Sequence, residues 1–377
     1  MSTTSEKAAL SRTSNEAARH PAAASVLNGA RGHAQGDANH PAAYQTHCQS
    51  PCQTPYQAPF WLPGAHLQTI IPALFSRLPL PAYRRERWDT PDGDFIELDW
   101  ADAPPQHSSQ APLFVLFHGL EGSSGSHYAR AFAAAAHAHG WHAVIPHFRS
   151  CSGPMNLLPR FYHLADAAEV DWVLRRLAAR HAGPLVVAGV SLGGNVLLHW
   201  LAQQREDARI VSAAAAISAP LDVHAGGKML ANGFGMVYTR SFLKTLKVKA
   251  LQKLEQYPGL FDAQAVLATR NMYEFDDVVT APLHGFKSAH DYYTRATVRP
   301  KLGEIAVPTL VLNARNDPFL PGDALPAHHE VSSAVELEQP EDGGHVGFMT
   351  GPFPGRNDWL AQRVTRYLSP HLAKTHG

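Results

Sequence analysis

From residue 111 onward, short apolar runs alternate with stretches of helical periodicity. The apolar runs are typical of buried strands, and they lie at 112–117, 185–188, 213–218, the start of 307–321, and 334–338. The helical stretches are an alanine-rich one at 128–139 that stops at a glycine, one with an apolar stripe at 170–177, and one at about 358–368. This alternation predicts an α/β fold built on a mostly parallel, doubly wound sheet.

Three segments depart from the alternation. Residues 1–55 are rich in Ala, Ser, Thr, His, Gln and Pro, which predicts a disordered tail. Residues 56–110 are expected to hold an anchoring segment and an antiparallel hairpin. At about 220–300 the pattern predicts inserted helices with aromatic and aliphatic faces. We interpret 56–377 as one domain and the insertion as a cap over a binding site, with plain helical packing as the alternative.

The charge of the chain is balanced. Lys and Arg number 32, Asp and Glu also number 32, and charged residues make up 17% of the sequence. This composition argues against nucleic acid as a partner. Inside the predicted insertion, a helix face carries Lys244, Lys247, Lys249 and Lys253. We expect this face to be a solvated surface rather than a site for lipid headgroups.

The sequence also allows a prediction of the cellular compartment. No apolar run reaches 18 residues, and the first residues lack the apolar core of a secretory signal. Cys48, Cys52 and Cys151 do not make a disulfide framework, and no metal site is expected at Cys48 and Cys52 in the polar tail. These features predict a cytoplasmic protein with no transmembrane segment.

The strongest chemical signal is a G-x-S-x-G pentapeptide. Gly189, Ser191 and Gly193 follow the apolar run 185–188 and precede the helical stretch 194–201. This context predicts a nucleophile elbow, which holds a serine on a sharp turn between strand and helix. Glycines suit the elbow because strand and helix approach closely there. The alternative is a surface turn with an incidental serine.

A serine hydroxyl needs a general base, and the base needs an orienting acid. Asp317 is the candidate acid because it follows the apolar run that begins at Val307. It would therefore lie at the carboxyl edge of the sheet, where catalytic groups gather. Asp342 is a weaker candidate because it is too close to the histidine loop. The pair Asp276 and Asp277 is expected to order the junction between cap and core.

His345 is the candidate base among 23 histidines. It follows the run 334–338 and stands after Gly343 and Gly344, which let its loop fold back over the sheet edge. The order of serine, acid and histidine along the chain is the one that α/β-hydrolases use.

An oxyanion hole is the fourth expected part. The run 112–117 ends in an H-G-L-E-G loop, and backbone N–H groups in such loops stabilise negative charge during acyl transfer. We predict Leu120 N–H and Leu192 N–H as the two donors. His118 is expected to hold the shape of the loop rather than act as a base.

Several further segments carry a family resemblance. They are F-W-L-P-G-A-H-L-Q-T-I at 60–70, W-D-T-P-D-G-D at 88–94, F-R-S-C-S-G at 148–153 and F-D-D-V-V-T-A-P-L-H-G-F at 275–286. With the elbow, they make residues 59–370 resemble the YheT-like group of α/β-hydrolases, α/β-hydrolase family 4. Ser191, Asp317 and His345 fall on the matching motif positions. Ser150 departs from the pattern, because relatives usually carry glycine there.

The residues predict a serine hydrolase that cleaves carboxylic esters through an acyl-serine and needs no cofactor. The resemblance implies short-chain esters or monoacylglycerol-like lipids as substrates. A thioesterase or amidase would use the same triad, so that choice stays open. A dehalogenase or epoxide hydrolase would carry an aspartate nucleophile in place of Ser191. A non-catalytic binding protein of the same fold would normally have lost part of the triad.

Overall fold

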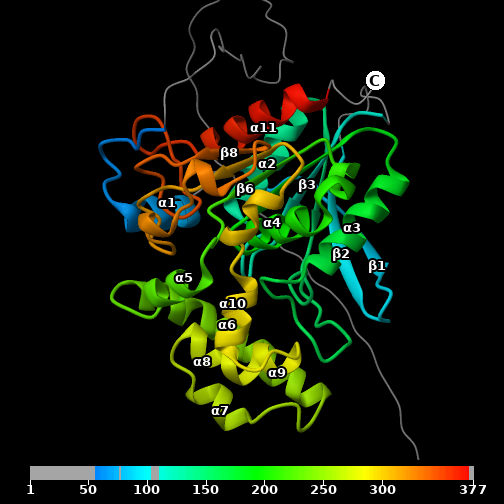
Figure 1. The fold of residues 1–377 in the computed structure, drawn as a ribbon, viewed down its shortest axis with the longest axis vertical. Helices are drawn as coiled ribbons and strands as arrows, with labels where there is room; N and C mark the ends of the chain where they lie inside the picture. The colour runs from blue at the N-terminus through cyan, green and yellow to red at the C-terminus, as the bar shows by residue number, and fades with distance from the viewer. Residues whose placement is uncertain (1–55, 76–77, 103–109, 373–377) are drawn as a thin grey trace, which may run out of the picture. The chain divides into compact units, whose positions relative to one another are not determined.

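An eight-stranded sheet runs through the computed structural model, which describes residues 56–75, 78–102 and 110–372 (Figure 1). The predicted tail at 1–55, with Cys48 and Cys52, lies outside the described residues. The strands are β1 Arg84–Asp89, β2 Phe95–Ala101, β3 Leu113–Phe117, β4 His142–Pro146, β5 Leu185–Val190, β6 Ala213–Ile217, β7 Thr309–Leu312 and β8 Val335–Glu338.

The strands are ordered β1-β2-β4-β3-β5-β6-β7-β8 across the sheet. β1 pairs with β2 and β2 with β4 in antiparallel fashion, whereas every later pair is parallel. The turn between β1 and β2 includes Gly93, whose φ of 84° suits glycine. Both the expected hairpin and the mostly parallel sheet are thus confirmed.

Helices cover both faces of the sheet. They are α1 Ala65–Phe75, α2 His127–Ala138, α3 Ala167–Arg180, α4 Leu192–Gln204, α5 Val223–Leu230, α6 Gly235–Gln256, α7 Ala263–Ala268, α8 Met272–Phe275, α9 Ala281–Leu283, α10 Ala289–Ala296 and α11 Trp359–Leu372. Alternate residues of β3 point to opposite faces: Val115 packs in the core with α3 and α4, and Phe114 packs in the core with α2 and α11. The doubly wound fold is therefore confirmed.

Helices α5 to α10 lie between β6 and β7, and we call this segment, residues 223–296, the inserted helices. In Figure 1 they gather as a separate green-to-yellow group beside the sheet. They have small apolar cores of their own, one around Tyr292 and one around Leu243. A π-helical turn, Asp276–Thr280, separates α8 from α9.

The predicted solvated lysine face is wrong for three of its four residues, since Lys247 is half-buried and its Nζ donates to Leu267 O and Thr269 O. Lys253 is fully buried, and its Nζ donates hydrogen bonds to Asn156 O at 2.6 Å and Gln256 Oε1 at 2.9 Å. Burial lowers the pKa of Lys253 to about 8. Lys249 turns toward the sheet and pairs with Glu121. Helix α6 therefore uses lysines to bind loops of the sheet domain, because a backbone carbonyl and a carboxylate lie within their reach.

The two aspartates of the insertion also have other partners than expected. Asp276 accepts hydrogen bonds from Thr280 Oγ1 at 2.6 Å and Tyr293 Oη at 3.0 Å, and Asp277 accepts one from Ala289 N at 2.8 Å. The bonds from Tyr293 and Ala289 tie the π-helical turn to α10, and the bond from Thr280 lies within the turn. They order the inserted helices internally, rather than the junction with the sheet domain.

Ser150 occupies a conformation that favours glycine, with φ at 64°. Its Oγ donates a hydrogen bond to Asn156 Oδ1 at 2.7 Å and accepts one from Asn156 N at 3.1 Å. These two bonds hold the serine in a left-handed conformation that L-residues otherwise avoid.

Candidate active site

Ser191 lies on the turn that joins β5 to α4, with φ 53° and ψ −118°. Its N–H donates to Ile217 O at 2.8 Å, which ties the turn to the end of β6. The flanking glycines leave no room for a side chain. A Cβ on Gly189 would lie 2.4 Å from Gly193 O, and a Cβ on Gly193 would lie 2.3 Å from Phe117 O. Strand and helix can approach this closely only with glycine at both positions.

Three side chains from distant parts of the sequence form one hydrogen-bonded line. His345 Nε2 lies 2.9 Å from Ser191 Oγ, and His345 Nδ1 lies 2.9 Å from Asp317 Oδ2. Asp317 follows β7 and His345 follows β8, so both reach the sheet edge where Ser191 stands. A carboxylate can only accept hydrogen bonds, so Nδ1 of His345 carries the proton and donates to Asp317. Nε2 of His345 is then free to accept a hydrogen bond from the Ser191 hydroxyl.

The carboxylate of Asp317 is buried and the His345 ring is nearly so, with 1% and 11% of their side chains exposed. Asp317 Oδ1 also accepts the N–H of Phe319 at 2.8 Å. The Phe319 ring stacks on His345, with centroids 4.0 Å apart and planes at 19°. Sequence reasoning missed Phe319, although a large apolar residue in the polar loop after the acid was a usable signal.

The backbone around Leu120 leaves a donor free. In this loop Gly119 N donates to Tyr128 Oη, Glu121 N to Tyr162 Oη, and Gly122 N to Gly119 O. Among the described residues, the N–H groups of Leu120 and Leu192 donate to no acceptor, and both residues line the cavity beside Ser191. Their donors are therefore available to a ligand.

His118 is fully buried behind this loop. Its Nε2 accepts the N–H of Phe148 at 3.1 Å, so Nδ1 carries the proton and donates to Gly119 O at 2.8 Å. Burial lowers its pKa to about 3, which keeps the ring neutral. Both ring nitrogens form hydrogen bonds with backbone groups, as expected for a side chain that holds the shape of the loop.

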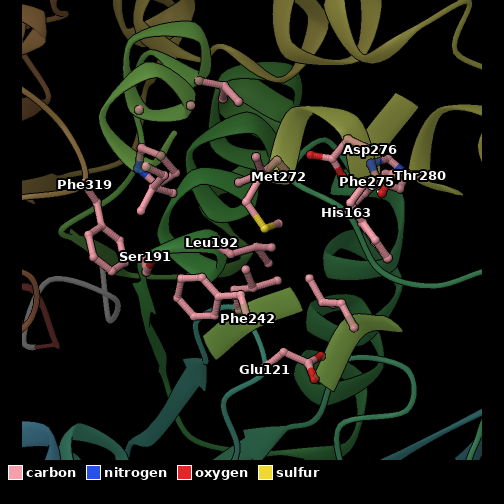
Figure 2. A pocket seen from close by; sticks show the side chains of 18 of the residues that line it. Glu121, His163, Ser191, Leu192, Phe242, Met272, Phe275, Asp276, Thr280 and Phe319 are labelled. Atoms are coloured by element: carbon pink, nitrogen blue, oxygen red, sulfur yellow. Dashed lines mark hydrogen bonds between the residues drawn. The ribbon is translucent and has the colours of Figure 1, made fainter. Parts of the chain in front are cut away.

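The rival acids lie elsewhere. Asp342 Oδ1 accepts from Gln68 Nε2 at 3.1 Å and from Asn316 Nδ2 at 3.0 Å. Asp276 lines the same cavity as Ser191, but Figure 2 shows it across the cavity from the serine. Burial raises the pKa of Asp276 to about 7.

A mostly apolar cavity of about 140 Å³ opens beside Ser191. The sheet edge contributes Leu192 and Phe319 to its lining, and the inserted helices contribute Phe242 and Met272 (Figure 2). Away from Ser191 and His345, its acidic, basic and histidine residues are Glu121, Lys249, His163 and Asp276. The sequence predicted the insertion as a cap over a binding site, but it did not indicate which residues of the insertion line the cavity beside Ser191.

Comparison with known proteins agrees with this architecture. The model of the family described as alpha/beta hydrolase fold matches residues 112–352. The chain belongs to the α/β-hydrolase family. Within this family it is 40% identical over 311 residues to YheT of Escherichia coli (strain K12), a protein named as a candidate esterase. That match covers 81% of this chain and 91% of the relative, so the chain is a YheT-like α/β-hydrolase.

Two further α/β-hydrolases extend the comparison. Phospholipase ABHD3 of Mus musculus is 29% identical over 316 residues, which cover 82% of this chain and 77% of that protein. The solved structure of α/β-hydrolase GrgF from Penicillium sp. sh18 superposes with a TM-score of 0.52 at 15% identity, over 78% of this chain and 99% of that one. The structural match shows a shared fold.

The described residues form neither a metal-binding cluster nor a membrane-spanning helix. Among residues 56–75, 78–102 and 110–372, no cluster of three His, Cys, Asp or Glu side chains is arranged to hold a metal ion. In the same ranges, no helix is both long and apolar enough to cross a membrane.

Proposed function

We propose that this chain is a carboxylic ester hydrolase in which Ser191 is the nucleophile, His345 the general base and Asp317 the orienting acid. The observation that carries the proposal is the hydrogen-bonded line from Ser191 Oγ through His345 to Asp317, with 2.9 Å at each step. This geometry lets His345 take the serine proton as the hydroxyl attacks a carbonyl carbon.

The reaction then proceeds in two halves. Attack of Ser191 Oγ forms a tetrahedral intermediate, whose oxyanion receives hydrogen bonds from Leu120 N–H and Leu192 N–H. His345 returns its proton to the departing alcohol, which leaves an acyl-serine. Water, deprotonated by His345, attacks the acyl-serine and releases the carboxylic acid. Asp317 stabilises the imidazolium in both halves, and none of these steps calls for a cofactor.

The cavity supports a short acyl group as the substrate. Its volume, about 140 Å³, is close to that of engineered apolar cavities that bind benzene. By this comparison, the cavity has room for roughly six to eight carbon atoms. The inserted helices act as the cap that excludes water from this space. The relatives named as a candidate esterase and a phospholipase support an ester, including a glycerolipid ester, as the bond that is cleaved.

The test uses 4-nitrophenyl esters from acetate to palmitate, with a matched thioester and anilide. We expect kcat/KM to peak at about four to eight acyl carbons and to be highest for the oxygen ester. Ser191→Ala should fold but lose several orders of magnitude in kcat, leaving about 10³–10⁴-fold over water from binding and the oxyanion hole. A fluorophosphonate probe should label the wild type and not the variant. Near wild-type turnover by folded Ser191→Ala would refute the nucleophile assignment.

A further inference from the structure

The N-terminal helix α1 contacts the loop that carries His345. Figure 1 shows α1, in blue, among the orange segments that follow β7 and β8. The contact is close. A Cβ on Gly347 would lie 1.8 Å from Gln68 O, and a Cβ on Gly344 would lie 2.8 Å from Thr69 Oγ1. Glycine at these two positions lets the helix and the histidine loop touch backbone to backbone.

Three consecutive backbone N–H groups of this loop are held by side chains. Gly343 N donates to Gln68 Oε1 at 2.8 Å, Gly344 N to Asn316 Oδ1 at 2.9 Å, and His345 N to Thr69 Oγ1 at 2.9 Å. Two of the acceptors belong to α1, and the third is the residue before Asp317. The backbone of His345 is therefore fixed by groups outside its own loop.

The acceptors are themselves held in place. Gln68 is 1% exposed, and its Nε2 donates to Leu62 O and Asp342 Oδ1, both at 3.1 Å. Asn316 Nδ2 donates to Gln68 Oε1 at 2.9 Å and to Asp342 Oδ1 at 3.0 Å. The Thr69 hydroxyl donates to Ala65 O at 2.7 Å while it accepts from His345. Gln68 and Thr69 are both buried, and each donates and accepts hydrogen bonds within this network, which makes their positions rigid.

We propose that Gln68 and Thr69 are positioning residues that hold His345 in line with Ser191 and Asp317. This inference rests on the proposed function, because it concerns the same base. The Nε2–Oγ distance of 2.9 Å depends on where the loop backbone lies, and a displacement of about 1 Å costs on the order of 10²-fold in rate. Through Gln68 and Thr69, the H-L-Q-T segment at 66–69 thus positions the general base and does more than anchor the N-terminal part of the domain.

The test compares Thr69→Val, which keeps the shape of threonine but loses the hydroxyl, with Thr69→Ser, which keeps the hydroxyl. We expect Thr69→Val to lower kcat on a short 4-nitrophenyl ester by about 10- to 100-fold with KM within about twofold. Phosphonylation of Ser191 by a fluorophosphonate should slow in parallel. Thr69→Ser should retain kcat within about threefold.

Thr365→Val is the matched control. Thr365 is buried in α11, and its Oγ1 donates to Ala361 O at 2.9 Å, the same bond within a helix that Thr69 makes to Ala65. Thr365→Val therefore loses the helix bond without touching the histidine loop, and it should keep kcat and the labelling rate. Wild-type kcat in folded Thr69→Val, or an equal loss in Thr365→Val, would overturn the positioning role. A wild type that labels at Ser191 but cleaves no ester would instead refute the proposed substrate.

Discussion

Backbone strain is concentrated around the proposed reaction centre. Ser191, Ser218 and Val346 have φ values of 53°, 49° and 61°, in the left-handed region that L-residues avoid. Each such residue costs roughly 1–3 kcal/mol and persists only where surrounding contacts hold it. Here Ser218 N donates to Leu312 O at 2.8 Å, and Ser218 Oγ accepts Val346 N at 3.1 Å. The ends of β6, β7 and the histidine loop are thus locked together beneath Ser191.

At the same scale, the assignment of the acid makes a prediction. Asp317→Asn should leave the fold intact but let His345 adopt the other tautomer, which lowers kcat by up to about 10⁴-fold. Asp342→Asn should cost less than about tenfold, because an amide oxygen can still accept from Gln68 and Asn316. Measurement of kcat for both variants on one ester decides between them. A larger loss for Asp342→Asn would place the acid at 342.

At the scale of elements, α6 connects the inserted helices to the loop that follows β3 through an ion pair. Lys249 Nζ lies 2.7 Å from Glu121 Oε1, with 21% and 11% of the two side chains exposed. Glu121 follows Leu120 directly and has φ at 55°. Glu121 lines the cavity next to Leu120, whose N–H we propose as an oxyanion donor, and Lys249 balances the charge of the Glu121 carboxylate. Like charges in a partly desolvated site repel strongly.

Lys249→Met should remove the cation beside that carboxylate, which would keep only the hydrogen bond from Tyr162 Oη, and so raise the energy of the negatively charged transition state. We expect kcat to fall about tenfold, equivalent to roughly 1.4 kcal/mol. Lys244→Met, which removes an exposed lysine from the same helix, should leave kcat within about twofold. The double variant Lys249→Met with Glu121→Gln should regain most of the loss. Equal kcat for the Lys249 and Lys244 variants would contradict the electrostatic explanation.

At the scale of the whole molecule, the first described residue already belongs to the core. Tyr56 is 4% exposed, its Oη donates to Met349 O at 2.7 Å, and its ring packs on Phe348 and Trp359. The described residues belong to the compact unit 54–377, so the predicted tail should be separable at that point.

A chain that begins at Thr54 should therefore melt cooperatively near the wild-type temperature and keep its ester turnover. A chain that begins at Gln57 additionally loses the buried Tyr56, which should lower the free energy of unfolding by about 3 kcal/mol. Thermal denaturation of both proteins beside the full chain separates the two effects. Loss of the cooperative transition in the Thr54 chain would show that residues 1–53 pack on the domain.

Local patterns in the sequence were enough to predict the alternation of strands and helices. They also identified Ser191, Asp317 and His345, the three side chains that the fold brings within hydrogen-bonding distance. The alternation and the turn at Ser191 were predictable because periodicity and turn sterics act between residues that are close in sequence, whereas Asp317 and His345 were found from the order of serine, acid and histidine that α/β-hydrolases use. The steric demand for glycine at 189 is likewise set within the turn, by Gly193 O, whereas the demand at 193 is set by Phe117 O in β3.

Other features depended on which distant segments the fold places together. Thr69 lies 276 positions from the His345 N–H that it accepts, and Lys253 lies 97 positions from Asn156 O. Helical spacing indicated only that the lysines lie on one helix that also has an apolar face. Their burial follows from the loops of the sheet domain that pack against this helix. Partner choice across such separations is set by tertiary packing, because no local interaction distinguishes a buried lysine or threonine from an exposed one.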